Sequence, residues 1–271
     1  MSDYFKSIVE TYIENWDPFL RKHSIATQLI PITRYWLDVL INCSYLNTES
    51  GYSPTDSELS TLTEIASAID VQLKMFPNGA FIRLGSRSPK DSWLVYKQGM
   101  KCLTGKHAVN MFLDSERISD DLALSKANNY TPYIAIRQWL EIEPWQEFRC
   151  FYKDRKLVGI SQYDYHKGYQ PEIEKNISGI QLAIEIKSKD ITKYLPYDGT
   201  VIADYIYKVK NRDNQYINEA ILLELNPWTV LTDPCLFDWH KNNFEKSEFR
   251  YLGRDGNLVV LDMVLQTAGQ K

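Results

Sequence analysis

The chain has 271 residues, of which 44% are hydrophobic and 13% aromatic, and its formal net charge is −4. A chain of this length can bury a large core, as one large domain or as two closely joined lobes. A slightly acidic chain lacks the basic footprint of a general nucleic-acid binder. DNA is therefore not expected as a partner, and the charge gives RNA no support without excluding it.

The cysteines and histidines exclude two further kinds of site. The four cysteines, at positions 43, 102, 150 and 235, show no C-x-x-C spacing, which indicates reduced thiols rather than a disulfide framework. The four histidines are equally dispersed without an H-E-x-x-H pattern, so zinc is not expected. The chain has no apolar run of about 18 residues and no signal-peptide pattern. We therefore expect a cytoplasmic protein with no membrane partner.

The first half of the chain predicts mostly helices. Apolar residues recur at helical spacing over residues 5–16, so an amphipathic helix is expected there. Thr55 and Glu58 form a capping-box pattern at the start of another helix. Strands are expected at residues 79–84 and, from the apolar run WLVY, at residues 93–96.

The second half of the chain predicts mostly strands. Residues 132–139 form one expected strand, and residues 148–163 form a hairpin around a charged turn. Pro171 is well placed to begin an amphipathic helix. A second hairpin is expected at residues 201–226. Strands that gather in this way predict an α+β fold rather than a doubly wound α/β fold.

A polar stretch at residues 127–132 marks the expected lobe boundary. Residues 1–130 would form an N-terminal lobe with the helices and a phosphate-binding loop. Residues 131–271 would form a C-terminal lobe with an antiparallel sheet and a metal site.

The hairpin after residue 200 carries two acids that are expected to face each other. Because side chains alternate along a strand, Asp204 lies on one face with apolar neighbours, and Glu224 is expected on the same face as Leu222. If the turn is centred at Asn214, Asp204 falls directly opposite Glu224.

This pair of acids predicts a metal site. Two carboxylates so close repel each other, and apolar neighbours keep water away, so a bound cation is the natural partner. Asp204, Glu224 and Asn226 offer only oxygen ligands, which suit Mg²⁺. Replacing either acid by its amide would then leave the metal-free protein no less stable. The alternative is a hairpin whose acids lie on a solvated edge.

A cationic loop follows the strand at residues 79–84. The loop and the strand end carry Arg83, Ser88, Lys90 and Asp91, a mixture of cations and hydroxyls that suits a polyphosphate. Neither a P-loop nor a G-x-G-x-x-G motif is present. The alternative is a solvated loop with ordinary surface charge.

Further candidates lie on two strands. Arg149 stands inside the strand EFRCF, where it would either pair with an acid such as Glu147 or reach a phosphate. Arg137, Gln138 and Trp139 end a strand that can offer a wall to a nucleotide base, although Trp139 also fits a plain core position. Together with the cationic loop and the oxygen ligands, these residues describe a site for a Mg–nucleoside triphosphate. No nucleophile motif occurs, so no catalytic residue is assigned.

The chain resembles the cell division cycle protein 123 family, a branch of the ATP-grasp superfamily. The similarity spans nearly the whole chain. It is carried by NWDPFLRKHSI near the start, Arg83–Leu84 with Ser88–Asp91, residues 136–165 with EFRCFYKDRKLVGISQYDY, IADYIY around Asp204, and ELNPW and TDPCLFDW between residues 224 and 239.

The resemblance implies an ATP-grasp fold, in which two α+β lobes hold ATP between them. The cofactor-binding positions that it implies are Arg83, Ser88, Lys90, Asp91, Arg137, Gln138, Trp139 and Arg149, and the implied Mg²⁺ ligands are Asp204, Glu224 and Asn226. Two positions depart from the family pattern: Arg83 stands where the family usually has lysine, and Glu224 where it usually has aspartate. Arginine keeps the charge but changes the binding geometry.

The resemblance also implies two functions. Eukaryotic members act as assembly factors for translation initiation factor two, so the first expectation is an ATP- and Mg-dependent protein-assembly chaperone with a protein client. The alternative is a ligase or a phosphoryl or nucleotidyl transferase that acts on a peptide, protein or RNA. Whether ATP is turned over is left open by the sequence.

Overall fold

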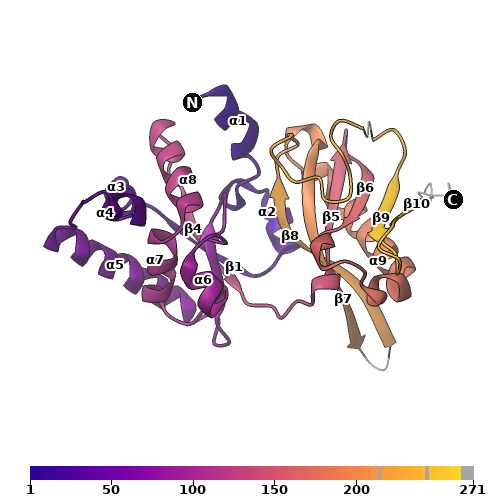
Figure 1. Ribbon diagram of the computed structural model, residues 1–271, viewed down its shortest axis with the longest axis horizontal. Helices are drawn as coiled ribbons and strands as arrows, with labels where there is room; N and C mark the ends of the chain where they lie inside the picture. Colours follow the sequence, from indigo (N-terminus) through magenta and orange to yellow (C-terminus); the bar gives the residue numbers. More distant parts are fainter. Residues whose placement is uncertain (213–214, 242–243, 264–271) are drawn as a thin grey trace. The chain divides into compact units, whose positions relative to one another are not determined.

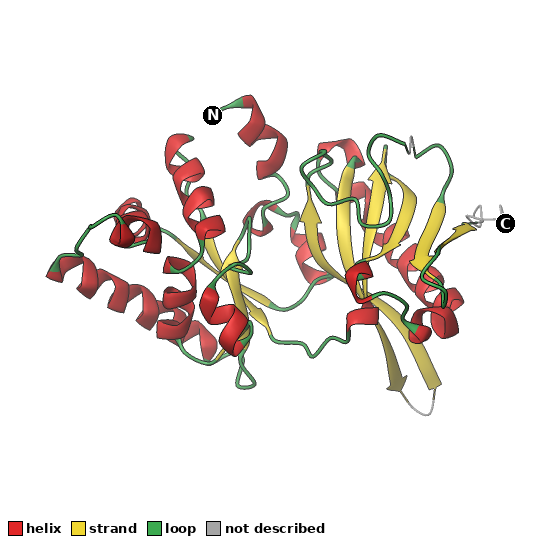
Figure 2. Ribbon diagram, in the orientation of Figure 1, coloured by secondary structure: helices red, strands yellow, loops and turns green. Residues whose placement is uncertain are grey.

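The structure is a computed structural model that describes residues 1–212, 215–241 and 244–263 (Figures 1 and 2). The chain divides into two compact units. The first comprises Met1–Asn15 and Ala26–Leu140, and the second comprises Trp16–Ile25 and Glu141–Lys271. Each unit contains one sheet with helices, so the predicted mixed α+β class is confirmed. In the described part of the chain, every helix is too short or too polar to cross a lipid bilayer.

The division differs from the predicted boundary at residue 130. The strand β4 (Tyr133–Gln138) belongs to the first unit, because it pairs on both sides with strands of that unit. Residues 16–25 return to the second unit, where Ser24 forms a bridge with Leu222. Neither pairing leaves a local signal in the sequence.

The first unit has an antiparallel sheet in the order β1-β4-β2-β3. Besides β4, its strands are β1 (Thr27–Pro31), β2 (Ala80–Leu84) and β3 (Lys101–Cys102). Its helices are α1 (Asp3–Val9), α3 (Arg34–Asn42), α4 (Tyr45–Glu49), α5 (Asp56–Leu73), α6 (Trp93–Gln98), α7 (Gly105–Leu113) and α8 (Glu116–Ala127). The predicted capping box is confirmed at the start of α5, where Thr55 and Glu58 bond each other's backbone.

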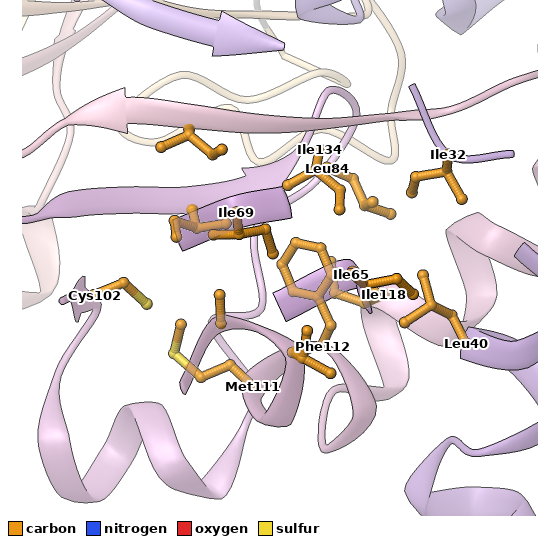
Figure 3. Close-up of a cluster of buried hydrophobic side chains, with 14 of the residues drawn as sticks. Ile32, Leu40, Ile65, Ile69, Leu84, Cys102, Met111, Phe112, Ile118 and Ile134 are labelled. Carbon is orange, nitrogen blue, oxygen red and sulfur yellow. The ribbon is translucent and has the colours of Figure 1, made fainter. Parts of the chain in front are cut away.

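One face of this sheet packs against the helices and forms the core of the first unit (Figure 3). Ile69 from α5, Phe112 from α7 and Ile134 from β4 meet there. Burial of each such side chain stabilises the unit by about 1.5–3 kcal/mol. Helix α7 approaches α5 closely at Gly105, where a Cβ atom would lie 1.9 Å from the carbonyl oxygen of Ala66. Only glycine fits at that point.

One predicted element of the first unit is shorter than expected, and another is wrong. The helix expected over residues 5–16 ends at Val9, whose carbonyl accepts the side-chain amide of Asn15 at 2.8 Å. The strand expected at residues 93–96 is helix α6, because Ser92 caps the backbone N–H of Leu94 at 3.1 Å. A short apolar run fits a strand or a helix equally well, and the cap decides.

The second unit has a six-stranded sheet in the order β10-β9-β6-β5-β7-β8. Its strands are β5 (Glu147–Lys153), β6 (Lys156–Gln162), β7 (Val201–Arg212), β8 (Gln215–Asn226), β9 (Glu248–Leu252) and β10 (Leu258–Asp262). Among its described residues, the helical elements are α2 (Pro18–Lys22), α9 (Pro171–Ile191) and the short 3₁₀ turns η2 (Pro144–Gln146), η3 (Tyr165–Lys167), η4 (Thr192–Tyr194) and η5 (Tyr197–Gly199). Figure 1 shows β7 and β8 running past the ends of the other strands.

The two faces of this sheet have different neighbours. Helix α9 packs on one face, where the hydroxyl of Tyr152 in β5 lies within hydrogen-bonding distance of Ser188 in α9 and of Tyr205 in β7. The predicted hairpin of β5 and β6 is confirmed, with positive φ at both turn residues, Asp154 and Arg155. The predicted helix start at Pro171 is also confirmed. The face opposite α9 carries the candidate site.

Glu14 in the first unit supplies a test of this fold. It lies in the 3₁₀ turn η1 (Ile13–Asn15), and its carboxylate accepts a hydrogen bond from the hydroxyl of Tyr130 at 2.9 Å. Burial raises the pKa of Glu14 from 4.5 to about 7. The folded protein therefore binds this proton more tightly than the unfolded chain, and the associated stability is present below pH 4.5 and lost as the pH rises through about 7.

We predict that Glu14→Gln removes this part of the pH dependence. Relative to the Gln variant, the wild-type protein should lose up to about 3 kcal/mol of unfolding free energy between pH 4 and pH 8. Urea unfolding of both proteins across this range measures the difference, and other titrating groups cancel in it. Parallel pH profiles for the two proteins would contradict the burial of Glu14 as an acid.

Candidate functional site

Strands β7 and β8 place the two predicted acids opposite each other. The register runs regularly from Arg212↔Gln215 to Tyr205↔Leu222, and the next pair is Asp204↔Glu224. Two residues of β8 therefore oppose one residue of β7, which is a β-bulge. The predicted pairing of Asp204 with Glu224 is confirmed, whereas the predicted turn centre at Asn214 lies outside the described residues.

The bulge also corrects a prediction. Directly paired residues lie on the same face of a sheet, so Leu222 shares a face with Tyr205, and Glu224 shares the opposite face with Asp204. Strict alternation along β8 predicts Leu222 and Glu224 on one face of the sheet, and this prediction is wrong. The extra residue, Leu223, shifts the alternation by one position.

A row of polar side chains crosses the sheet on the face opposite α9. Each member pairs directly with the next across the five strands β8, β7, β5, β6 and β9. The row is Glu224, Asp204, Arg149, Ser161 and Arg250. The sequence pointed to the first three members but not to Ser161 or Arg250. The only signal for Arg250 was that EFRYL repeats the EFR of EFRCF.

The centre of this row is a buried ion pair. Arg149 donates from Nε to Oδ1 of Asp204 at 2.8 Å and from Nη2 to Oδ2 at 2.7 Å. Asp204 is 0% exposed and Arg149 is 4% exposed. Of the two roles that the sequence left open for Arg149, the structure shows an ion pair, and the partner is Asp204 rather than Glu147.

The pKa values of the pair reflect its burial. Burial raises the pKa of Asp204, and the nearby Glu224 raises it further, while Arg149 opposes both effects. Burial alone would lower the pKa of Arg149, but the carboxylate of Asp204 raises it well above the ordinary value. Asp204 therefore has Arg149 as its counter-ion. This overturns the expectation that its charge is merely repelled by Glu224.

The donor set fits a hard divalent cation. The side-chain Nδ2 of Asn226 donates to Oδ2 of Asp204 at 2.9 Å and to Oε1 of Glu224 at 3.4 Å, so the three side chains meet at one point of the sheet with the amide nitrogen toward the carboxylates. Two carboxylates and an amide carbonyl are ligands that Mg²⁺ accepts. Over the described residues, no group of three His, Cys, Asp or Glu side chains could hold a metal ion. A metal here would depend on Asn226 as its third protein ligand.

The chain after β8 lies over the polar row and is held by it. Arg149 donates from Nη1 to the carbonyl of Asp233 at 2.6 Å. The N–H of Leu236 donates to Oγ of Ser161 at 3.1 Å, and Arg250 donates to the carbonyl of Leu236 at 3.2 Å. We refer to residues 229–237 as the covering loop. Three members of the polar row thus fix its backbone.

Aromatic packing holds the covering loop at its far end. Phe237 packs against Phe151 and Phe244, with ring centroids 4.8 and 5.2 Å away. Gly159 in β6 leaves the space for this ring, because a Cβ atom there would lie 2.7 Å from Phe237. Trp239 donates from Nε1 to the carbonyl of Thr232 at 2.8 Å. The covering loop is therefore fixed by polar contacts and by an apolar cluster.

Arg83 and Arg137 lie in the first unit, on the sheet face opposite its helical core. Arg83 is buried and donates to the carbonyls of Leu84 at 3.0 Å and Ser86 at 2.8 Å. Arg137 is fully buried and donates from Nε to Thr27 at 3.2 Å. Both arginines thus have structural partners within the protein, and their contact with a nucleotide stays a prediction.

The remaining loop candidates have different surroundings. Asp91 accepts hydrogen bonds from the hydroxyl of Ser115 and the N–H of Arg117, so it stabilises the start of α8. Ser88 is buried, whereas Lys90 is exposed. The placement of Asp91 favours a structural role. It does not test whether Ser88 or Lys90 contacts a phosphate.

The last two candidates end strand β4. Gln138 is exposed, and Trp139 is half-buried, with its backbone N–H donating to Gly79 at 3.3 Å. The Nζ of Lys101 lies 5.8 Å from the centre of the Trp139 ring. The ring is therefore not a plain core residue, and its predicted contact with a base remains untested.

Comparisons with known proteins show what the chain is similar to. It is 26% identical over 269 residues to the translation initiation factor eIF2 assembly protein of Xenopus laevis. The matched region covers 87% of this chain and 77% of the relative. The protein of the same name from Aspergillus oryzae is 27% identical, over 86% of this chain and 61% of the relative.

Among solved structures, Cdc123 from Schizosaccharomyces pombe is similar with a TM-score of 0.72 and 21% identity, covering 92% of this chain and 98% of that chain. This likeness shows a shared fold. The model of the D123 family matches residues 42–259, well over half of the chain. The chain therefore belongs to the D123 family.

Proposed function

We propose that this chain is an ATP-grasp protein that binds Mg·ATP at Asp204, Glu224 and Asn226 and acts as an assembly factor for an eIF2-like client. The observation that carries the nucleotide part is the pairing of two acids across β7 and β8, with an amide beside them. Two carboxylates and an amide at one place on a sheet face offer the oxygen ligands that a hard divalent cation prefers. The superfamily assignment itself rests on the sequence resemblance.

Different residues of the second unit would bind the metal and neutralise the phosphates of ATP. Asp204, Glu224 and Asn226 would hold Mg²⁺, which when bound neutralises phosphate oxygens. Arg149 lies beside Asp204 and supplies a cation that is buried and therefore weakly screened. In the first unit, Arg83, Ser88, Lys90, Asp91, Arg137, Gln138 and Trp139 remain the proposed nucleotide contacts. Of these, Asp91 has the weakest support because it already caps α8.

The client part of the proposal rests on relatives. The translation initiation factor eIF2 assembly proteins of two Xenopus species and of Aspergillus oryzae match 86–87% of this chain. Their identities of 25–27% support a shared general role. Glu224 in place of the usual aspartate lengthens one metal ligand, so the nucleotide site is where this chain is expected to differ.

We predict that Glu224→Gln weakens Mg·ATP binding by about tenfold or more, which corresponds to about 1.4 kcal/mol. The variant keeps the size of the side chain but removes one charged metal ligand. Calorimetry with ATP, with and without Mg²⁺, measures the effect. Glu219→Gln is a matched control, because Glu219 lies on the same strand and pairs with Lys210. Equal binding by wild type with and without Mg²⁺ would reject the metal site.

We predict that replacing the two acids has unequal effects on the stability of the protein without a bound metal. Asp204→Asn should lower the unfolding free energy by about 3 kcal/mol, because Arg149 stays buried without a charged partner. Glu224→Gln should change it by less than about 1 kcal/mol, because it also relieves repulsion with Asp204. Denaturant unfolding in the presence of a chelator measures both. A harmless Asp204→Asn would contradict the ion pair.

We predict that the chain promotes association of the γ and α subunits of eIF2 in an ATP-dependent manner. Purified subunits are mixed with the chain and Mg·ATP, and the complex is measured by size-exclusion chromatography. Glu224→Gln should reduce complex formation, whereas Glu219→Gln should not. With labelled ATP in the same mixture, the formation of labelled ADP or AMP shows whether ATP is turned over. A labelled macromolecule without any γ–α complex would favour a ligase or transferase instead.

A further inference from the structure

The guanidinium of Arg149 joins the proposed cation site to the covering loop. One edge of the group, Nε and Nη2, holds Asp204 at 2.8 and 2.7 Å, and the third nitrogen, Nη1, holds the carbonyl of Asp233 at 2.6 Å. A guanidinium is planar and rigid, with its donors in a fixed fork. It therefore cannot turn away from Asp204 without moving the atom that holds the loop.

A cation at Asp204 would compete with this guanidinium. Both oxygens of the carboxylate already accept hydrogen bonds from Arg149, and Oδ2 also accepts from Asn226. A divalent ion bound to either oxygen would lie close to the positive charge of Arg149. The repulsion between them is weakly screened, because Asp204 and Arg149 are both buried.

We infer that Arg149 is a positioning residue that serves as the internal counter-ion of the acid pair in the metal-free protein, and that a divalent cation displaces it from Asp204 and so loosens the covering loop. This inference rests on the proposed function of the acid pair. The ion pair and the phosphate contact, which the sequence leaves as alternatives for Arg149, then become two successive states of one side chain. The released guanidinium is free to meet the phosphates that arrive with the cation.

The covering loop provides a readout that does not depend on activity. The N–H of Leu236 donates to Ser161, and the N–H of Cys235 donates to the side chain of Asp233. Loss of the Arg149–Asp233 contact removes a restraint on this backbone. Amide exchange should therefore rise in the loop, because locally loosened segments open more often.

The first measurement uses the full wild-type chain with Mn²⁺ alone, without nucleotide. Hydrogen exchange over residues 229–237 should become about threefold faster or more when Mn²⁺ saturates the protein. Residues 173–191 of α9, on the opposite face of the sheet, should not respond. This measurement needs no variant, so it stands even if a substitution at Arg149 prevents folding.

The second measurement compares variants for Mn²⁺ affinity and loop exchange. Arg149→Gln should bind Mn²⁺ about tenfold more tightly, because coupling between two competitors is reciprocal. Its loop should exchange rapidly without Mn²⁺ and show no further response. Arg250→Gln is the matched control: Arg250 holds the carbonyl of Leu236 in the same loop and forms an ion pair with Glu248. It should raise basal exchange, keep the Mn²⁺ response and leave the affinity unchanged.

The outcomes separate this inference from the proposed function. If Mn²⁺ and Mg·ATP bind wild type but Arg149→Gln gains no affinity, or the wild-type loop does not respond, the inference is overturned and the nucleotide site stands. If neither binds wild type, or both bind Asp204→Asn equally well, the nucleotide site fails and the inference fails with it. Tighter Mn²⁺ binding by Arg149→Gln together with a loop response in wild type supports both.

Discussion

The buried ion pair between Arg149 and Asp204 is the interaction on which the second unit depends. Two opposite charges stand side by side on adjacent strands, both almost completely removed from water. Such a pair is costly to separate, because either partner left alone would be a buried charge. It fixes the acid of the proposed cation site, and through Nη1 of Arg149 it also fixes the backbone of the covering loop at Asp233. Structure and candidate function therefore share the same atoms.

The β-bulge at Leu223 places the side chain of Glu224 on the same sheet face as Asp204. With an unbroken register from the hairpin turn, Asp204 would face Leu223, and Glu224 would point to the face that carries α9. One extra residue in β8 brings the second carboxylate and Asn226 to the polar face instead. Bulges recur beside functional sites because they re-aim a side chain. A single extra residue in β8 thus places the two carboxylates opposite each other.

The candidates in the first unit illustrate a different constraint. Arg83 and Arg137 are buried on the sheet face that the helical core leaves uncovered, and backbone or hydroxyl oxygens accept their hydrogen bonds. Asp91 stabilises the start of α8. A charged side chain in such a place must be satisfied within the protein whatever else it contacts. Arg83, Arg137 and Asp91 therefore each have a structural role, whatever else they contact.

The sequence by itself determined the features that depend on neighbouring residues or on strand alternation. These are the capping box at Thr55 and Glu58, the α+β class and the hairpins. Only the tertiary structure decided which partner Arg149 takes, that β4 belongs to the first unit, and that Ser161 and Arg250 complete the polar row. Those outcomes arise from strand pairings between distant segments. Local patterns specify faces and turns, whereas the choice of a partner strand depends on the packing of the whole unit.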